Sequence, residues 1–165
     1  KLLKVGLPKL LRAARDYPFI LVAPQCPVDS WWTRELHELS TFLKDFLKRY
    51  SVDKKRVYLT GLSMGGDGTW RLAALQPKLF AAIVPICGRD KSNSASKLKN
   101  IPTWAFHGAK DNIVPVKESK KVVRAIKELG GNAKLTIYSD ANHNAWDRAY
   151  KTKELYHWLF AQHKS

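Results

Sequence analysis

Segments typical of β-strands alternate with segments typical of α-helices along most of this chain. Apolar runs rich in β-branched and aromatic residues occur at 19–24, 57–60, 81–87, 103–107 and 134–138. Helical patterns occupy 31–50, 64–76, 117–129 and 145–162. Because consecutive strands joined by helices pair in parallel through right-handed crossovers, the alternation predicts an α/β fold. We expect a mostly parallel sheet of about five strands with flanking helices.

Length and composition limit the chain to one ordinary globular domain. Its 165 residues, 45% of them hydrophobic, are enough for a substantial core, and no internal repeat or linker divides residues 1–165. No apolar run approaches the roughly 20 residues of a membrane-spanning helix. The cysteines, Cys26 and Cys87, could be buried thiols or one disulfide. No spacing typical of a metal site occurs, so we expect no metal.

The chain carries an unusual excess of positive charge. Its 29 Lys and Arg against 14 Asp and Glu give a net charge of +15. Such a surface could attract a polyanion, and a polyanion-binding module remains one alternative. The lysines are dispersed over 44–56, 89–99 and 117–127, however, and no signature of a nucleic-acid-binding fold accompanies them. This distribution favours a solvated surface over specific nucleic-acid recognition.

A G-x-S-x-G motif lies where one predicted strand meets the next helix. Residues 57–70 read VYLTGLSMGGDGTW, which places Ser63 between Gly61 and Gly65. A tight strand-to-helix turn exposes the hydroxyl so that a histidine can approach one side and an acyl carbon the other. The free N–H groups at the start of the helix, including that of Met64, would face developing negative charge. The motif therefore predicts that Ser63 is a nucleophile.

Two further reactive groups follow later strands. Asp111 comes after the 103–107 run, and His143 comes after the 134–138 run. The carboxyl ends of parallel strands meet at one edge of the sheet, so we expect these groups to lie near Ser63. His143 would take and return the proton of Ser63, and Asp111 would hold the imidazole. The chain order Ser…Asp…His is that of α/β-hydrolase triads.

Other residues compete for these roles. Asp90 follows the 81–87 run and could also reach a histidine, so it stays open as an alternative acid. Asp140 precedes His143 by three residues and fits a turn former better. His107 lies within an apolar strand end, where a hydrogen-bonded core histidine is expected.

The chain resembles the phospholipase/carboxylesterase-like serine esterases of the α/β-hydrolase superfamily, with relatives among feruloyl esterases and polyhydroxyalkanoate depolymerases. The matching segments are FILVAPQCP, WWTRELHEL, VDKKRVYLTGLSMGGDGTW, FAAIVPICG, IPTWAFHGAKDNIVP and YSDANHNAW. The resemblance implies a cofactor-independent serine esterase in which Ser63, Asp111 and His143 form the triad. It also implies an oxyanion donor at Met64 and a place for Gln25 near the mouth of the site.

The aromatic residues Trp31, Trp32 and Trp146 lie near predicted strand-end loops and could form a wall of the substrate site. Packing is the alternative role for each of them. No long lid is evident in this sequence. We therefore expect short acyl or aryl esters, including feruloyl-type esters, as substrates.

The sequence departs from its relatives at the N-terminal side. Relatives carry further strands before the equivalent of FILVAP, including one that ends in a His-Gly turn and supplies a second oxyanion N–H. The chain resembles the C-terminal two-thirds of such an enzyme, and losing one donor would lower turnover roughly 100- to 1,000-fold. A catalytically impaired fragment, acting as a scaffold or a complementing half, is therefore an alternative function.

The same departure bears on assembly. Right-handed crossovers would place the helices at 31–50, 64–76 and 117–129 on one face of the sheet. The other face would be left to the C-terminal helix and residues 1–18. We expect the strand at 19–24 either to pair directly with 57–60 or to leave a gap there. The chain would then self-associate or pair with an N-terminal segment.

Overall fold

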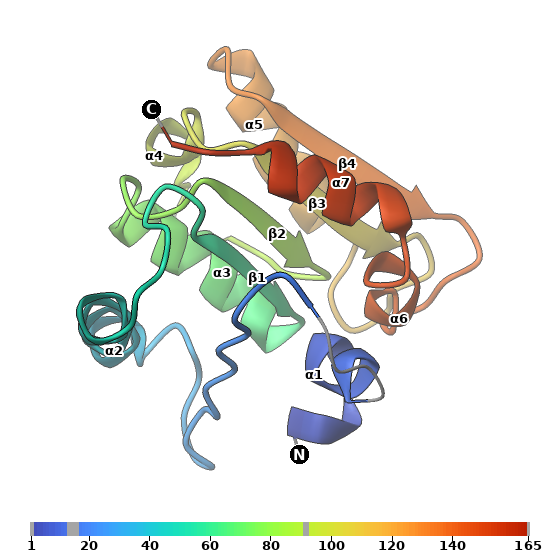
Figure 1. Ribbon diagram of the computed structural model, residues 1–165. Coiled ribbons are helices and arrows are strands. Elements are labelled where there is room, and N and C mark those ends of the chain that lie inside the picture. Colours follow the sequence, from blue (N-terminus) through green and yellow to red (C-terminus); the bar gives the residue numbers. More distant parts are fainter. Residues whose placement is uncertain (1, 13–16, 91–92, 165) are drawn as a thin grey trace.

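A parallel four-stranded sheet forms the centre of the computed structural model, which describes residues 2–12, 17–90 and 93–164 (Figure 1). The strands are β1 (Tyr58–Leu62), β2 (Ala82–Ile86), β3 (Thr103–Gly108) and β4 (Ala133–Tyr138), and they lie side by side in chain order. All three neighbouring pairs are parallel. The predicted α/β class and parallel sheet are therefore confirmed.

Helices fill both sides of the strands. The longer ones are α2 (Leu36–Arg49), α3 (Met64–Leu75), α5 (Lys117–Glu128) and α7 (Lys153–Ala161). The shorter ones are η1 (Leu2–Lys4), α1 (Gly6–Leu11), α4 (Ala95–Leu98) and α6 (Trp146–Ala149). The helical pattern at 31–50 thus begins as helix only at Leu36, and the pattern at 145–162 is divided between α6 and α7.

Two apolar clusters cover opposite faces of the sheet. One joins Ile83 and Ala105 of the strands to α3 and α5, with α2 packed against it. The other joins Val84 and Phe106 to α6 and α7, with Leu7 of α1 against it. Adjacent strand residues face opposite ways because side chains alternate along a strand. As predicted, α2, α3 and α5 lie on one face of the sheet and α7 on the other (Figure 1). Residues 1 and 13–16 of the predicted 1–18 cover lie outside the described residues.

The predicted strand at 19–24 is wrong. These residues have no strand conformation, and the sheet of the described chain has four strands with β1 at one edge. A strand is held by a ladder of backbone hydrogen bonds to a neighbour, and 19–24 does not pair with β1. Its described packing comes from side chains instead, with the ring of Phe19 5.7 Å from that of Phe160 on α7.

Both cysteines are free thiols and both are buried. Of the two possibilities left open by the sequence, the structure shows buried thiols and no bond between them. No helix of the described residues has the length and apolar character needed to cross a membrane.

Candidate functional site

Ser63 occupies a strained turn between β1 and α3. Its backbone has φ 51° and ψ −118°, a conformation that residues with a side chain rarely adopt. Its N–H donates to the carbonyl of Ile86 at 2.9 Å, which ties the turn to β2. Strand β1 enters the turn and α3 leaves it at Met64, so the Ser63 side chain lies at the carboxyl edge of the sheet.

Glycine at position 61 lets this turn close. A Cβ atom there would overlap the backbone carbonyl of Gly65 and lie 2.8 Å from the hydroxyl of Thr69. A Cβ at Gly65, by contrast, would meet nothing within 4 Å. The two glycines of the motif thus differ in purpose, since only the first is required by a close backbone approach.

Ser63, His143 and Asp111 form a chain of hydrogen bonds across three loops. The Ser63 Oγ atom lies 2.8 Å from His143 Nε2, and His143 Nδ1 lies 2.7 Å from Asp111 Oδ2. An ionised carboxylate only accepts, so Nδ1 carries a proton and Nε2 can accept the proton of Ser63. The structure brings together the three residues predicted from the sequence.

The loop of His143 crosses closely over the end of β3. A Cβ at Gly108 would overlap the carbonyls of Ala141 and Asn142, so only glycine admits this approach. The N–H of Lys110 donates to Ala141 at 3.0 Å and joins the Asp111 loop to the His143 loop. The hydrogen bond between His143 and Asp111 therefore rests on a backbone contact between their loops.

The carboxylate of Asp111 is buried but well supplied with donors. Its Oδ1 atom accepts the N–H groups of Ile113 at 2.9 Å and Val114 at 2.8 Å. Burial raises the pKa of Asp111, but the hydrogen bonds from His143, Val114 and Ile113 outweigh it and hold that pKa below its ordinary value. Asp111 is therefore ionised at neutral pH.

The alternative acids lie elsewhere. Asp90 is buried and accepts the N–H of Ser94 at 2.8 Å. Asp140 is exposed and pairs with Arg148 at 2.9 Å. Neither of these described contacts involves His143, whereas Asp111 contacts it directly. The geometry therefore favours Asp111 as the partner of His143.

The other predicted site residues differ in their placement. Met64 opens α3, where a backbone N–H has no helical partner. The ring of Trp146 stands edge-on to that of His143 with centroids 5.4 Å apart. Gln25 is exposed, and its amide donates locally to the carbonyl of Cys26. Trp31 is also exposed, and Trp32 packs on α3 against Gly68.

Two contacts at the site were not predicted from the sequence. His107 was expected to be a hydrogen-bonded core histidine, and it is, but its Nε2 also lies 3.2 Å from Asp111 Oδ2. Cys87 lies close enough that its sulfur and the ligand atoms of Asp111 and His143 are within 4.8 Å of one another. An unusual backbone conformation, φ 48° at Cys87, accompanies this approach. No sequence signal marked either contact.

These three ligand atoms are close enough for a metal ion, yet their protonation favours hydrogen bonding. Burial raises the pKa of Cys87 to about 11, so its thiol is protonated at neutral pH. Asp111 and His143 already bind each other. We therefore interpret this group as part of the hydrogen-bonded site.

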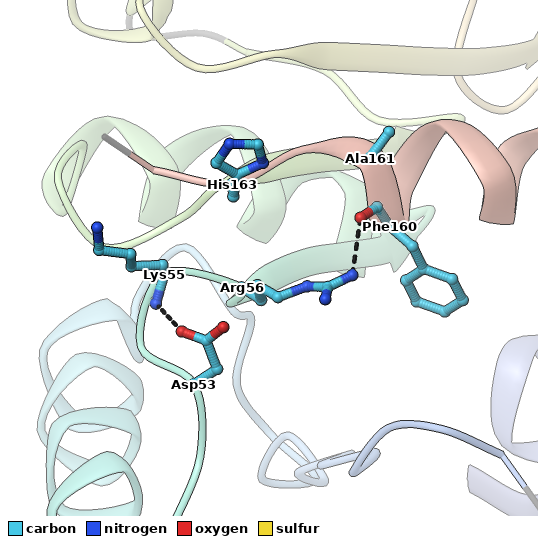
Figure 2. A pocket seen from close by; sticks show the side chains of 6 residues that line it. All are labelled: Asp53, Lys55, Arg56, Phe160, Ala161 and His163. Atoms are coloured by element: carbon cyan, nitrogen blue, oxygen red, sulfur yellow. Dashed lines mark hydrogen bonds between the residues drawn. The ribbon is translucent and has the colours of Figure 1, made fainter.

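A separate hollow of about 440 Å³ lies near the amino end of β1, away from Ser63 (Figure 2). Its lining includes Lys55, Arg56 and His163, together with the acidic Asp53. The Arg56 guanidinium donates to the carbonyl of Phe160 at 2.8 Å. Because charges of both signs share the hollow and Arg56 is already engaged, the hollow does not favour polyanion binding.

Comparisons with known proteins agree with this fold. The model of the dienelactone hydrolase family matches residues 29–154. A bifunctional acetylxylan esterase/xylanase of Neocallimastix patriciarum is 25% identical over 145 residues, which span 85% of this chain and 21% of that protein. A putative carboxymethylenebutenolidase of Escherichia coli (strain K12) is 30% identical over 105 residues, spanning 58% of this chain and 38% of that protein. The chain thus spans less than half the length of either relative.

One solved structure has a similar fold. The crystal structure of a thermostable esterase superposes with a TM-score of 0.83 at 35% identity, covering 86% of this chain and 43% of that one. The resemblance to α/β-hydrolase esterases noted from the sequence is confirmed at the level of fold and family.

Proposed function

This chain belongs to the dienelactone hydrolase family, and from the geometry of its site we propose that it is a serine esterase. The observation that carries the proposal is the continuous hydrogen-bond chain from Ser63 through His143 to Asp111. The thermostable esterase and the acetylxylan esterase among its relatives support ester hydrolysis over other reactions.

The first half of the reaction transfers the acyl group to the protein. Ser63 Oγ attacks the ester carbonyl carbon while its proton moves to His143 Nε2. Asp111 stabilises the resulting imidazolium, and the N–H of Met64 donates to the oxyanion. When the C–O bond to the alcohol breaks, His143 returns its proton to the departing oxygen and an acyl-serine remains.

The second half releases the acid. A water molecule gives a proton to His143 Nε2 and attacks the acyl carbon. The bond to Ser63 Oγ then breaks, and His143 protonates that oxygen, which regenerates the starting state. The strained turn keeps Ser63 Oγ accessible in both halves.

The substrates we propose are short acyl or aryl esters, including feruloyl-type esters. The aromatic ring of Trp146, whose centroid lies 5.4 Å from that of His143, offers apolar surface beside the proposed reacting centre. Turnover on p-nitrophenyl esters from C2 to C16 should be fastest with the short chains. A maximum at the longest chain would contradict this assignment.

The catalytic role of Ser63 can be tested directly. A fluorophosphonate probe followed by peptide mapping should label Ser63, and Ser63→Ala should lower p-nitrophenyl acetate turnover by roughly 10³-fold or more. Ser96→Ala, at an exposed serine of α4, is the matched control and should retain labelling and turnover. A folded chain without label at Ser63 would instead favour a catalytically silent scaffold or complementing half.

A further inference from the structure

A second histidine, His107, contacts the Asp111 carboxylate that orients His143. His107, near the end of β3, is fully buried, and both of its ring nitrogens are engaged. Its Nδ1 lies 2.8 Å from Ser119 Oγ on α5, and its Nε2 lies 2.8 Å from the carbonyl oxygen of Val114. The same Nε2 is 3.2 Å from Asp111 Oδ2, the oxygen that also accepts the proton of His143.

The surroundings fix the tautomer of His107. A carbonyl oxygen only accepts, so the Nε2 atom facing Val114 carries the proton. Burial lowers the pKa of His107 and outweighs the raising effects of Val114 and Asp111, which keeps the ring neutral at neutral pH. The Ser119 hydroxyl, which lies 2.8 Å from Nδ1 and 3.3 Å from the carbonyl oxygen of Gly88, then donates its one proton to the nearer Nδ1. His107 therefore presents one N–H, shared between Val114 and Asp111.

The backbone of Val114 links Asp111 to His107. Its N–H donates to Asp111 Oδ1 and its carbonyl accepts from His107. Two hydrogen bonds therefore hold the Asp111 loop: one from Val114 to the Asp111 carboxylate, and one from His107 of β3 to the Val114 carbonyl. Loss of the His107 side chain would leave the buried Val114 carbonyl unpaired and the loop less constrained.

We propose that His107 is a positioning residue, which holds the Asp111 loop and competes with His143 for the negative charge on Asp111 Oδ2. The expected effect on kcat rests on the proposed esterase function. The expected effect on the NMR titration of His143 rests on the geometry alone. Removing the His107 N–H would leave Oδ2 a stronger acceptor for His143, so the imidazolium of His143 would be favoured.

The other groups that face Asp111 and His143 do not change the expected effect of removing His107 on the protonation of His143. Cys87 reaches the Asp111 carboxylate from the end of β2, but its thiol is protonated and stays so across the pH range of the assay. Ser63 faces His143 Nε2 as a neutral hydroxyl. Trp146 contributes an uncharged ring edge from α6. The charged partner of His143 among these contacts is Asp111.

The test compares three variants. His107→Leu removes both ring nitrogens at similar bulk, and His107→Gln keeps an amide N–H that can donate to Val114. Ser119→Ala removes the partner of Nδ1 but leaves the Nε2 contacts in place, so it controls for general disturbance of this core. For each variant, kcat/KM is measured against pH, and the ring of His143 is titrated by ¹H–¹⁵N NMR.

His107→Leu should lower kcat roughly 10- to 100-fold with little change in KM. The acid limb of its kcat/KM profile and the midpoint of the His143 titration should both move to higher pH. His107→Gln should restore most of the kcat and the original midpoint, and Ser119→Ala should leave the midpoint in place.

An unchanged or lowered His143 midpoint in folded His107→Leu would overturn the proposal. Because NMR reports this midpoint even in an inactive chain, failure of the positioning role is distinguishable from failure of the esterase function. If wild type shows no esterase activity while the midpoint still rises in His107→Leu, the positioning inference stands and the proposed function does not.

Discussion

At the scale of single residues, the two glycines that flank Ser63 should respond differently to the same substitution. Gly61→Ala would force a Cβ into the Gly65 carbonyl, and we expect it to lower the free energy of unfolding by about 1–3 kcal/mol and to reduce activity. Gly65→Ala places a Cβ in open space on a helix, where alanine is favoured by up to about 1 kcal/mol. Urea denaturation of both variants measures the difference, and equal destabilisation would contradict this account of the turn.

The ionisation of Asp111 predicts a pH dependence of stability. Because the folded state depresses the pKa of Asp111 below the value of 3.8 for an unperturbed group, its ionisation stabilises the fold above that pH. This contribution is lost as the pH falls through the lower, folded pKa. The difference in unfolding free energy between wild type and Asp111→Asn should therefore shrink below about pH 4. A difference that stays constant from pH 7 to pH 3 would argue against an ionised, hydrogen-bonded Asp111.

Residue types and their order along the chain were enough to nominate Ser63, Asp111 and His143. Each follows a strand, and parallel strands end at one edge of the sheet. The contacts of His107 and Cys87 with Asp111 could not be predicted in this way. They depend on the path of the 108–114 loop and on the left-handed backbone at Cys87, which no local pattern specifies.

At the scale of elements, the four predicted strands that pair with a neighbouring strand were confirmed, whereas the predicted strand at 19–24, which has no such partner, was not. Strands β2 and β3 are fully buried, and their continuous apolar runs mark them as inner strands. The FILVAP run at 19–24 has the same composition, yet it forms no strand. Composition reports the propensity for a strand, whereas a strand forms only where a partner completes its hydrogen bonds.

Helix α7 should contribute strongly to stability because it closes one face of the sheet. Leu155 is 2% exposed within the cluster under α7, whereas Leu75 at the end of α3 is 48% exposed. Leu155→Ala should lower the free energy of unfolding by about 2–5 kcal/mol. Leu75→Ala, the matched control, should change it by less than about 1 kcal/mol. Comparable losses in urea titrations would mean that α7 is not closely packed on the sheet.

At the scale of the whole molecule, apolar side chains gather on a segment that lies outside the sheet. Ile20, Val28 and Trp31 are 60%, 99% and 55% exposed. Ile20 lies in the 19–24 run that forms no strand, and Val28 and Trp31 lie between that run and α2. Strand β1 is an edge of the sheet, and an exposed edge offers unpaired backbone groups to another chain. These features favour self-association, which stays a prediction.

We expect self-association of this chain at low micromolar concentration. Its salt dependence tells whether apolar surface or charge drives the association. Copies that carry +15 repel one another, so screening by salt should strengthen an association driven by apolar surface. The double variant Ile20→Lys with Val28→Lys should sediment as a monomer, because two charges would enter the contact. Leu129→Lys, at a residue 49% exposed after α5, is the control and should associate like wild type. A compact wild-type monomer at this concentration would contradict the expectation.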